Sequence, residues 1–239
     1  MRKFTNMLKV MPIRADGRSK EELRELVIKA GVLKNAEGSA YVKMGNTVAV
    51  AGVYGPRELF PKFLQNPEKA HLKCRYNMAP FSTKDRKRPG QDRRSQEISK
   101  VVADALEAAI FTKEFPKVGI DIYIEILQGD AGTRCAGINA ASVALADAGI
   151  PMRGLIAAVA AGKVDGDYVL DLTYNEEEKT KADIPVAYMP SMKKITLLQM
   201  DGDLSADDLK NVVNVAIKGC EKVYEAQVEA LKNKYTAVL

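Results

Sequence analysis

The sequence contains a single histidine, His71, among its 239 residues. One histidine excludes a multi-histidine metal site and a histidine-rich acid–base site. A Ser–His–Asp triad would depend on His71 alone, and this residue lies in a polar, lysine-rich stretch without the strained turn that such a nucleophile needs. Histidine-based catalysis is therefore not the chemistry that the sequence favours.

Cysteine is also scarce, with three residues far apart, Cys74, Cys135 and Cys220. An odd number at this spacing is not a disulfide framework, and it suits a reducing compartment. No two of the three have the spacing of zinc ligands. We accordingly expect a cytoplasmic protein without a cysteine metal site.

Long hydrophobic runs are absent too, so no segment reaches the eighteen or so residues of a membrane helix and no membrane association is expected. Residues 1–12 are basic but lack the apolar core and cleavage site of a secretory signal. With 46% hydrophobic and 28% charged residues the composition is that of a soluble globular protein. The net charge of +5 is only weak support for a polyanionic partner.

The standard phosphate-binding motifs, G-x-x-x-x-G-K-[ST] and G-x-G-x-x-G, do not occur. Two Asp-x-Asp pairs, at Asp165 and Asp201, lack the glycine and the terminal glutamate of a calcium loop, so we interpret both as turns.

Hydrophobic periodicity predicts a mixture of strands and helices. Strands are expected at 39–44, 47–54, 118–127, 155–163, 168–172, 185–189 and 195–200, and helices at 95–114, 134–148 and from about 205. Residues 20–33 are compatible with helix or strand, whereas 55–94 and the charged stretch 175–181 read as irregular. No linker, repeat or low-complexity segment interrupts the chain, which favours one α+β domain.

The segment Gly129–Arg134 joins a predicted strand to the start of a helix. Free backbone N–H groups at a helix N-terminus bind anions, and Gly132 permits a close approach of the backbone. Thr133 adds a hydroxyl and Arg134 adds a planar donor fork suited to phosphate. An ordinary strand–helix turn with Thr133 as the N-cap is the other interpretation of this segment.

A second basic site lies at the start of the 95–114 helix, where Arg93 and Arg94 oppose the helix dipole, which is consistent with a bound anion. A solvated basic loop is the other interpretation of these two arginines. The preceding run 84–88, which includes Arg86 and Arg88, is suited to the backbone of a nucleic acid. Four aromatic side chains in this region are candidates for base stacking, or alternatively anchor loops to the core: Phe60, Phe63, Tyr76 and Phe81.

An acidic stretch contains Glu177 and Asp183, six residues apart between predicted strands. Two carboxylates brought together can hold a divalent cation, and one of them can act as a general acid. A solvated run of charge is the alternative. Together the three candidate sites supply what phosphate-dependent cleavage of a polyanion needs.

These residues resemble the RNase PH family of phosphorolytic 3′→5′ exoribonucleases from about Arg14 to Tyr235, and within it the catalytic ring subunits of archaeal exosomes. The matching runs lie at 14–18, 30–33, 38–40, 53–56, 75–82, 92–97, 125–134, 146–151, 171–172 and 182–185. The resemblance implies a single α+β domain over 14–239, of the ribosomal protein S5 domain 2-like fold with mixed sheets packed against helices, after an extension over 1–13. It also moves residues 23–33 from helix toward strand.

The resemblance further implies roles for individual residues. Arg94, Gly132, Thr133 and Arg134 would bind inorganic phosphate, the co-substrate, and Arg93 would grip RNA near its 3′ end. Asp183 would be an active-site carboxylate that helps to hold Mg²⁺.

Two positions depart from the pattern of the family. Glu177 stands where aspartate is common. Glutamate keeps the carboxylate and adds a methylene, and the resemblance implies that it shares the roles of general acid and metal ligand with Asp183. Lys62-Phe63 replaces a basic–histidine pair at the narrow entrance of the ring, where Lys62 keeps the charge and Phe63 is able to stack on a base.

The implied partners are single-stranded RNA, an inactive paralogue that completes a hexameric ring of three heterodimers, and RNA-binding cap subunits. The implied products are nucleoside diphosphates, and the reverse reaction would add 3′ tails. Two alternatives remain open at this point: a homohexameric tRNA-trimming RNase PH, and a catalytically silent RNA-binding ring subunit. Retention of the arginines and of Asp183 favours an enzyme over the silent subunit.

Overall fold

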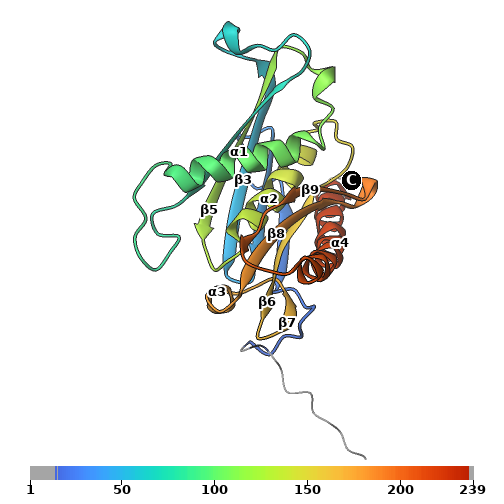
Figure 1. The fold of residues 1–239 in the computed structure, drawn as a ribbon. Coiled ribbons are helices and arrows are strands. Elements are labelled where there is room, and N and C mark those ends of the chain that lie inside the picture. The colour runs from blue at the N-terminus through green and yellow to red at the C-terminus, as the bar shows by residue number, and fades with distance from the viewer. Residues whose placement is uncertain (1–13, 15, 237–239) are drawn as a thin grey trace, which may run out of the picture.

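A computed structural model describes residues 14 and 16–236, and the extension predicted for residues 1–13 lies outside this part of the chain. The first of two sheets contains five strands (Figure 1). In spatial order these are β1 (Leu26–Ala30), β2 (Gly38–Met44), β3 (Thr47–Glu58), β5 (Val118–Gln128) and β4 (His71–Met78). β4 and β5 are parallel and the other pairs are antiparallel.

The second sheet is antiparallel and is centred on β8. Its strands are β10 (Asp201–Gly202), β8 (Ala182–Met189), β6 (Ala157–Val164), β7 (Asp167–Leu170) and β9 (Lys194–Leu198), which pairs with the far half of β8. The predicted hairpin is confirmed by the antiparallel pairing of β6 with β7. Asp165 and Gly166 form its two-residue turn, and both have the positive φ that such a turn requires.

Four α-helices and three short 3₁₀ helices accompany the sheets in the described part of the chain. The α-helices are α1 (Arg93–Glu107), α2 (Thr133–Asp147), α3 (Tyr174–Glu177) and α4 (Ala206–Thr236). The 3₁₀ helices are η1 (Lys62–Leu64), η2 (Thr112–Glu114) and η3 (Pro190–Met192). The predicted α+β class, with mixed sheets packed against helices, is confirmed.

The alanine-rich helix α2 lies between the two sheets and contacts β2, β3, β6 and β8. Twelve of its fifteen residues are buried, because small side chains on every face let both sheets approach closely. The predicted end at Gly149 is confirmed by a Schellman motif. In it the N–H of Gly149 bonds to the carbonyl of Ala146 at 3.0 Å, and the N–H of Ile150 to that of Leu145 at 3.2 Å. Helix α2 is therefore a rigid support for the loop that precedes it.

Two predictions of irregular structure are wrong. The stretch 55–94 contains the end of β3 and all of β4, where Leu72, Cys74 and Tyr76 point inward between exposed basic residues. This period of two is the pattern of an edge strand, and its charged face hid the strand signal. The charged stretch 175–181 begins inside α3, which starts in a capping box between Thr173 and Glu176.

The strand assignment that the family resemblance favoured for residues 23–33 is confirmed by β1, which pairs with β2. One hydrophobic core cluster runs through both sheets and around α2. Within residues 14 and 16–236, no helix is both long and apolar enough to cross a membrane.

Candidate active site

The loop before α2 has the backbone geometry of an anion site. Ala131 and Gly132 are both left-handed, with φ of 57° and 61°, and Gly132 is the N-cap of the helix. Thr133 is the first helical residue, and no side chain caps this end, so the alternative of Thr133 as N-cap is wrong. The first N–H groups of α2 and the Thr133 hydroxyl therefore remain able to receive a ligand.

Arg134, one residue further along α2, has spare hydrogen-bonding capacity. One terminal nitrogen donates to the side-chain oxygen of Gln199. Its Nε is buried and has no hydrogen-bond partner among the described residues. A buried unpaired donor is costly, so this guanidinium has a hydrogen-bond donor available to a ligand.

Tyr76 reaches the same place from β4. Only 1% of it is exposed, so it does not stack on RNA bases, and it anchors the strand instead. Burial raises the pKa of its hydroxyl to about 12, against the opposing influence of nearby Thr133, Arg94 and Arg134. The neutral hydroxyl of Tyr76 thus lies buried near Arg94 and Arg134.

Arg93 and Arg94 are the first two residues of α1, which begins two residues earlier than predicted. The helix is capped by Asp92, whose carboxylate accepts a 2.7 Å hydrogen bond from the N–H of Ser95. That hydrogen bond lowers the pKa of Asp92 to about 2. Both arginines are exposed, and neither forms an ion pair with any residue that the structure describes.

The carboxylates Glu177, on α3, and Asp183, on β8, lie within electrostatic range of each other. Burial raises the pKa of Asp183 to about 6, and the charge of Glu177 adds to this while Arg134 opposes it. Burial also raises the pKa of Glu177, against the opposing charge of Arg94. The structure therefore brings these two carboxyls together with Arg94 and Arg134.

Asp201 belongs to this cluster, although we interpreted it as part of a turn. It lies on β10 and pairs directly with Asp183 across the sheet. Its charge raises the pKa of both Glu177 and Asp183. No local signal marked Asp201 or Gln199, because each enters the site through the folding of the β8–β10 region.

The residues proposed to bind Mg²⁺ fit such an ion only in part. The Oδ1 atom of Asp183 is buried and has no hydrogen-bond partner among the described residues. In the same part of the chain, no group of three or more His, Cys, Asp or Glu side chains is arranged to hold a metal. This donor set suits a cation held by one or two carboxylates together with substrate phosphates, which is how Mg²⁺ is commonly bound.

Two of the remaining candidates lie away from this cluster. Lys62 and Phe63 are on η1, at the opposite end of the molecule from α3 (Figure 1). Phe63 is 83% exposed. Arg86 and Arg88 are exposed on the loop that leads into α1. RNA binding by these four residues remains a prediction.

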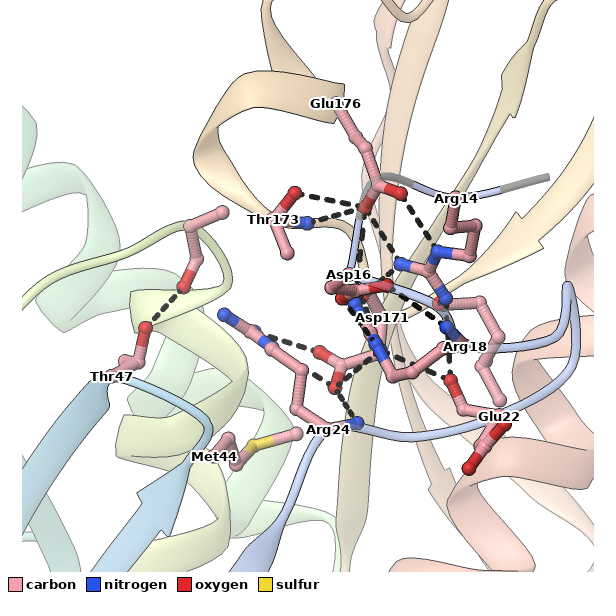
Figure 2. A network of polar contacts seen from close by, with 12 residues as sticks. Arg14, Asp16, Arg18, Glu22, Arg24, Met44, Thr47, Asp171, Thr173 and Glu176 are labelled. Atoms are coloured by element: carbon pink, nitrogen blue, oxygen red, sulfur yellow. Dashed lines mark hydrogen bonds and ion pairs between the residues drawn. The ribbon is translucent and has the colours of Figure 1, made fainter. Parts of the chain in front are cut away.

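A network of arginines and carboxylates joins residues 14–24 to Asp171 and Glu176 (Figure 2). Arg14 makes a forked ion pair with Glu176, with distances of 2.7 and 2.6 Å. Arg24 makes a second fork with Asp171, with distances of 3.1 and 2.7 Å. The motif at residues 14–18 had indicated a family resemblance but no role.

With the fold and these groups in view, the chain belongs to the 3′ exoribonuclease family, also called RNase PH. The model of the first family domain matches residues 22–151 and that of the second matches residues 154–219. The resemblance found in the sequence is thereby confirmed.

The curated relatives include archaeal proteins named exosome complex component Rrp41. The protein of Methanopyrus kandleri is 60% identical over 93% of this chain and 93% of its own. That of Thermococcus kodakarensis is 59% identical over 94% of this chain and 90% of its own. That of Nitrosopumilus maritimus is 50% identical over 93% and 91%.

Two solved structures share the fold. Rice Rrp46 matches with a TM-score of 0.83 and 23% identity over 92% of this chain and all of its own. An Archaeoglobus fulgidus exosome with RNA bound to the active site matches with a TM-score of 0.76 and 24% identity, over 89% and 91%.

Proposed function

We propose that this chain is a phosphate-dependent 3′→5′ exoribonuclease that acts as a catalytic ring subunit of an exosome. The observation that carries the proposal is the meeting of a free helix N-terminus and the unpaired Nε of Arg134 with two carboxyls of raised pKa. The first two bind an anion, and the carboxyls supply a proton near neutral pH.

In this mechanism inorganic phosphate is the nucleophile. Arg94, Arg134, the Thr133 hydroxyl and the N–H groups beside Gly132 hold it and neutralise its charge. A phosphate oxygen bonds to the phosphorus of the last phosphodiester, and the bond from that phosphorus to the preceding 3′-oxygen breaks. The products are a nucleoside diphosphate and an RNA with one nucleotide fewer.

The leaving 3′-oxygen takes a proton from Asp183 or Glu177. A pKa of about 6 keeps part of the Asp183 population protonated near neutral pH, which a free aspartate at 3.8 would not provide. When bound, Mg²⁺ would neutralise charge on the transferred phosphoryl group. Asp183, with its unpaired Oδ1, and Glu177 are the residues that would hold it.

RNA would be gripped through its backbone rather than read by sequence. Arg93 lies beside the phosphate site, and Arg86 and Arg88 lie on the loop leading to it. Lys62 and Phe63, at the opposite end of the molecule from α3, would contact the RNA further upstream. Because one phosphate linkage replaces another, the reaction is nearly balanced, and excess diphosphate would drive addition of 3′ tails.

We further propose a cytoplasmic location, a single folded domain over residues 14–239, and assembly with an inactive paralogue into a hexameric ring under RNA-binding cap subunits. The similarity to archaeal exosome components supports this assembly over a homohexameric tRNA-trimming enzyme. The core cluster shared by both sheets supports the single domain.

The test is degradation of a 3′-tailed single-stranded RNA with and without inorganic phosphate, using the chain alone and mixed with a candidate ring paralogue. Nucleoside diphosphates released only with phosphate, mainly in the mixture, are expected. Activity of the chain alone as a homo-oligomer would instead identify the tRNA-trimming type. RNA binding without phosphorolysis in either sample would identify a silent subunit.

A further inference from the structure

Arg24 joins two parts of the candidate site without belonging to either. Only 5% of its side chain is exposed. Its fork pairs with the carboxylate of Asp171 (Figure 2). Its third nitrogen donates to the backbone carbonyl of Asp130 in the loop before α2. One planar side chain thus contacts both the chain segment leading to α3 and the phosphate-binding loop.

Asp130 forms the second link between these parts. Its carboxylate accepts a 3.2 Å hydrogen bond from the N–H of Tyr174, the first residue of α3. Its carbonyl also accepts a 3.0 Å bond from the hydroxyl of Thr47, and its N–H donates to the same hydroxyl. The loop is therefore held by β3 on one side and by α3 on the other.

Asp171 sets the entry to α3. Its φ of 53° is left-handed, a conformation that a non-glycine residue keeps only when its surroundings enforce it. Its carboxylate accepts from both the backbone and the side chain of Arg24, and its carbonyl accepts from Arg14 at 2.8 Å and from Arg18 at 3.2 Å. These contacts fix the position at which α3 begins, and thereby the position of Glu177 on this helix.

We propose that Arg24 is a positioning residue that sets the placement of the phosphate-binding loop relative to the carboxylate helix α3. The inference rests on the proposed function, and Arg24 itself touches neither phosphate nor RNA. Its forked geometry is essential, because a lysine ammonium is a single compact charge that cannot pair with Asp171 and reach the Asp130 carbonyl together. A displacement of about 1 Å between reacting groups is enough to cost about a hundredfold in rate.

The first test is Arg24→Lys in the full-length chain, in whichever assembly shows phosphorolysis. Lysine keeps a positive charge beside the buried Asp171, so the melting temperature should stay within a few degrees. We expect the KM for phosphate to rise about tenfold and kcat to fall, while the KM for RNA is unchanged. The matched control is Lys20→Gln, which removes an exposed ion pair with Asp167 on the same segment and should alter neither constant.

The second variant, Asp130→Ala, removes the carboxylate that accepts from the N–H of Tyr174 and so cuts the direct link between the loop and α3. It spares the buried pair of Arg24 with Asp171 and the backbone carbonyl of residue 130 that Arg24 contacts. It should reproduce the rise in the KM for phosphate. Because both changes release the same loop, their effects should combine to less than the product of the two.

Three results would overturn the positioning role: an unchanged KM for phosphate in both variants, equal rises in both KM values with a lowered melting temperature, or fully multiplicative effects. A wild-type chain that is inactive in every assembly would instead contradict the proposed function. The two failures are distinguishable, because this one is measured on the wild type and the other on the variants.

Discussion

Glu176 and Glu177 are neighbours in one short helix, yet their carboxyl groups differ in their hydrogen-bond partners and in the direction in which their pKa values are shifted. Burial would raise the pKa of Glu176, but the hydrogen bonds from Arg14 and Thr173 and the charge of Arg14 together outweigh it and lower the pKa to about 2. Glu177 has no such partner in the part of the chain that the structure describes, and burial raises its pKa. The helix therefore turns one carboxylate toward a saturated network and the other toward the candidate active site.

The same contrast divides the arginines. Arg14 and Arg24 are buried and donate hydrogen bonds to carboxylates and backbone carbonyls. Arg94 has no ion pair within the described residues, and Arg134 keeps a buried Nε unpaired. Pairing satisfies a buried charge, whereas a buried donor without a partner costs stability and has capacity for a ligand. An exposed arginine such as Arg94 is solvated and has its donors free at no such cost. Five predictions test this difference.

The largest effect should come from Arg134→Ala. Arg134 contributes one side-chain hydrogen bond to the described structure, so its loss should leave the melting temperature nearly unchanged. Loss of a preorganised donor to the phosphate should lower kcat/KM by about a thousandfold. The measurement is phosphorolysis beside a thermal melt, with the exposed Arg57→Ala as the matched arginine control. Near-normal activity would contradict the assignment of the phosphate site.

Asp183→Asn should lower activity about a hundredfold and at the same time stabilise the fold. Because the folded-state pKa is raised from 3.8 to about 6, the native state holds its proton more tightly than the unfolded chain, and stability falls as pH rises through this range. The substitution should therefore raise the free energy of unfolding by about 1–2 kcal/mol at pH 8, with the gain vanishing near pH 4. Denaturant titration at both pH values measures this, and a loss of stability at pH 8 would refute it.

Glu177→Gln and Glu176→Gln sharpen the comparison between the two neighbours. Glu177→Gln should lower kcat about tenfold with little change in stability. It should also shift the pH–rate limb of Asp183 to lower pH, because the charge of Glu177 raises that pKa. Glu176→Gln should cost about 2 kcal/mol of stability by unpairing the buried Arg14.

The pH–rate profile and the denaturation curve of each variant separate these outcomes. A kcat for Glu177→Gln within a few-fold of wild type would make Asp183 the better candidate for the general acid. A destabilised Glu177→Gln beside an unaffected Glu176→Gln would reverse the comparison.

Phe63→Ala should raise the KM for long RNA about tenfold, because stacking of one base on an aromatic ring is worth about 1–3 kcal/mol. A short RNA that ends before reaching η1 is the internal control and should be cleaved normally. The measurement is KM as a function of RNA length. An equal effect on both lengths would place Phe63 outside the RNA path.

Tyr76→Phe should have the smallest effect. Removing a buried hydroxyl that lacks a hydrogen-bond partner among the described residues should leave the fold as stable or slightly more stable. The KM for phosphate should rise a few-fold if the hydroxyl contacts the bound phosphate. Isothermal titration with inorganic phosphate gives the affinity directly. An unchanged affinity would make Tyr76 an anchor of β4 and nothing more.

Local signals were enough to predict much of the fold. The apolar stripes of α1, α2 and α4, the end of α2 and the start of α4 are set by residues close together along the chain, so the sequence marks them directly. The end predicted for α1 at residue 114 is wrong, because α1 ends at Glu107 and Thr112–Glu114 form a separate 3₁₀ helix. β4 was missed because its exposed face carries basic residues, and β1 needed the family resemblance. The candidate site shows the same division. Gly129–Arg134 and Arg93–Arg94 are contiguous motifs that the sequence marks, whereas Gln199 and Asp201 reach the site only through the fold.

By itself the sequence determined α1, α2 and α4, most strands, the family and the residue types available for binding phosphate, but not α3. Only the tertiary structure decided which of these charges are satisfied. It placed Asp201 beside Asp183, brought Gln199 to Arg134, and put Arg24 between Asp130 and Asp171. The physical reason is range: a turn or a helix end is set by neighbouring residues, whereas burial and charge pairing depend on segments that are distant along the chain.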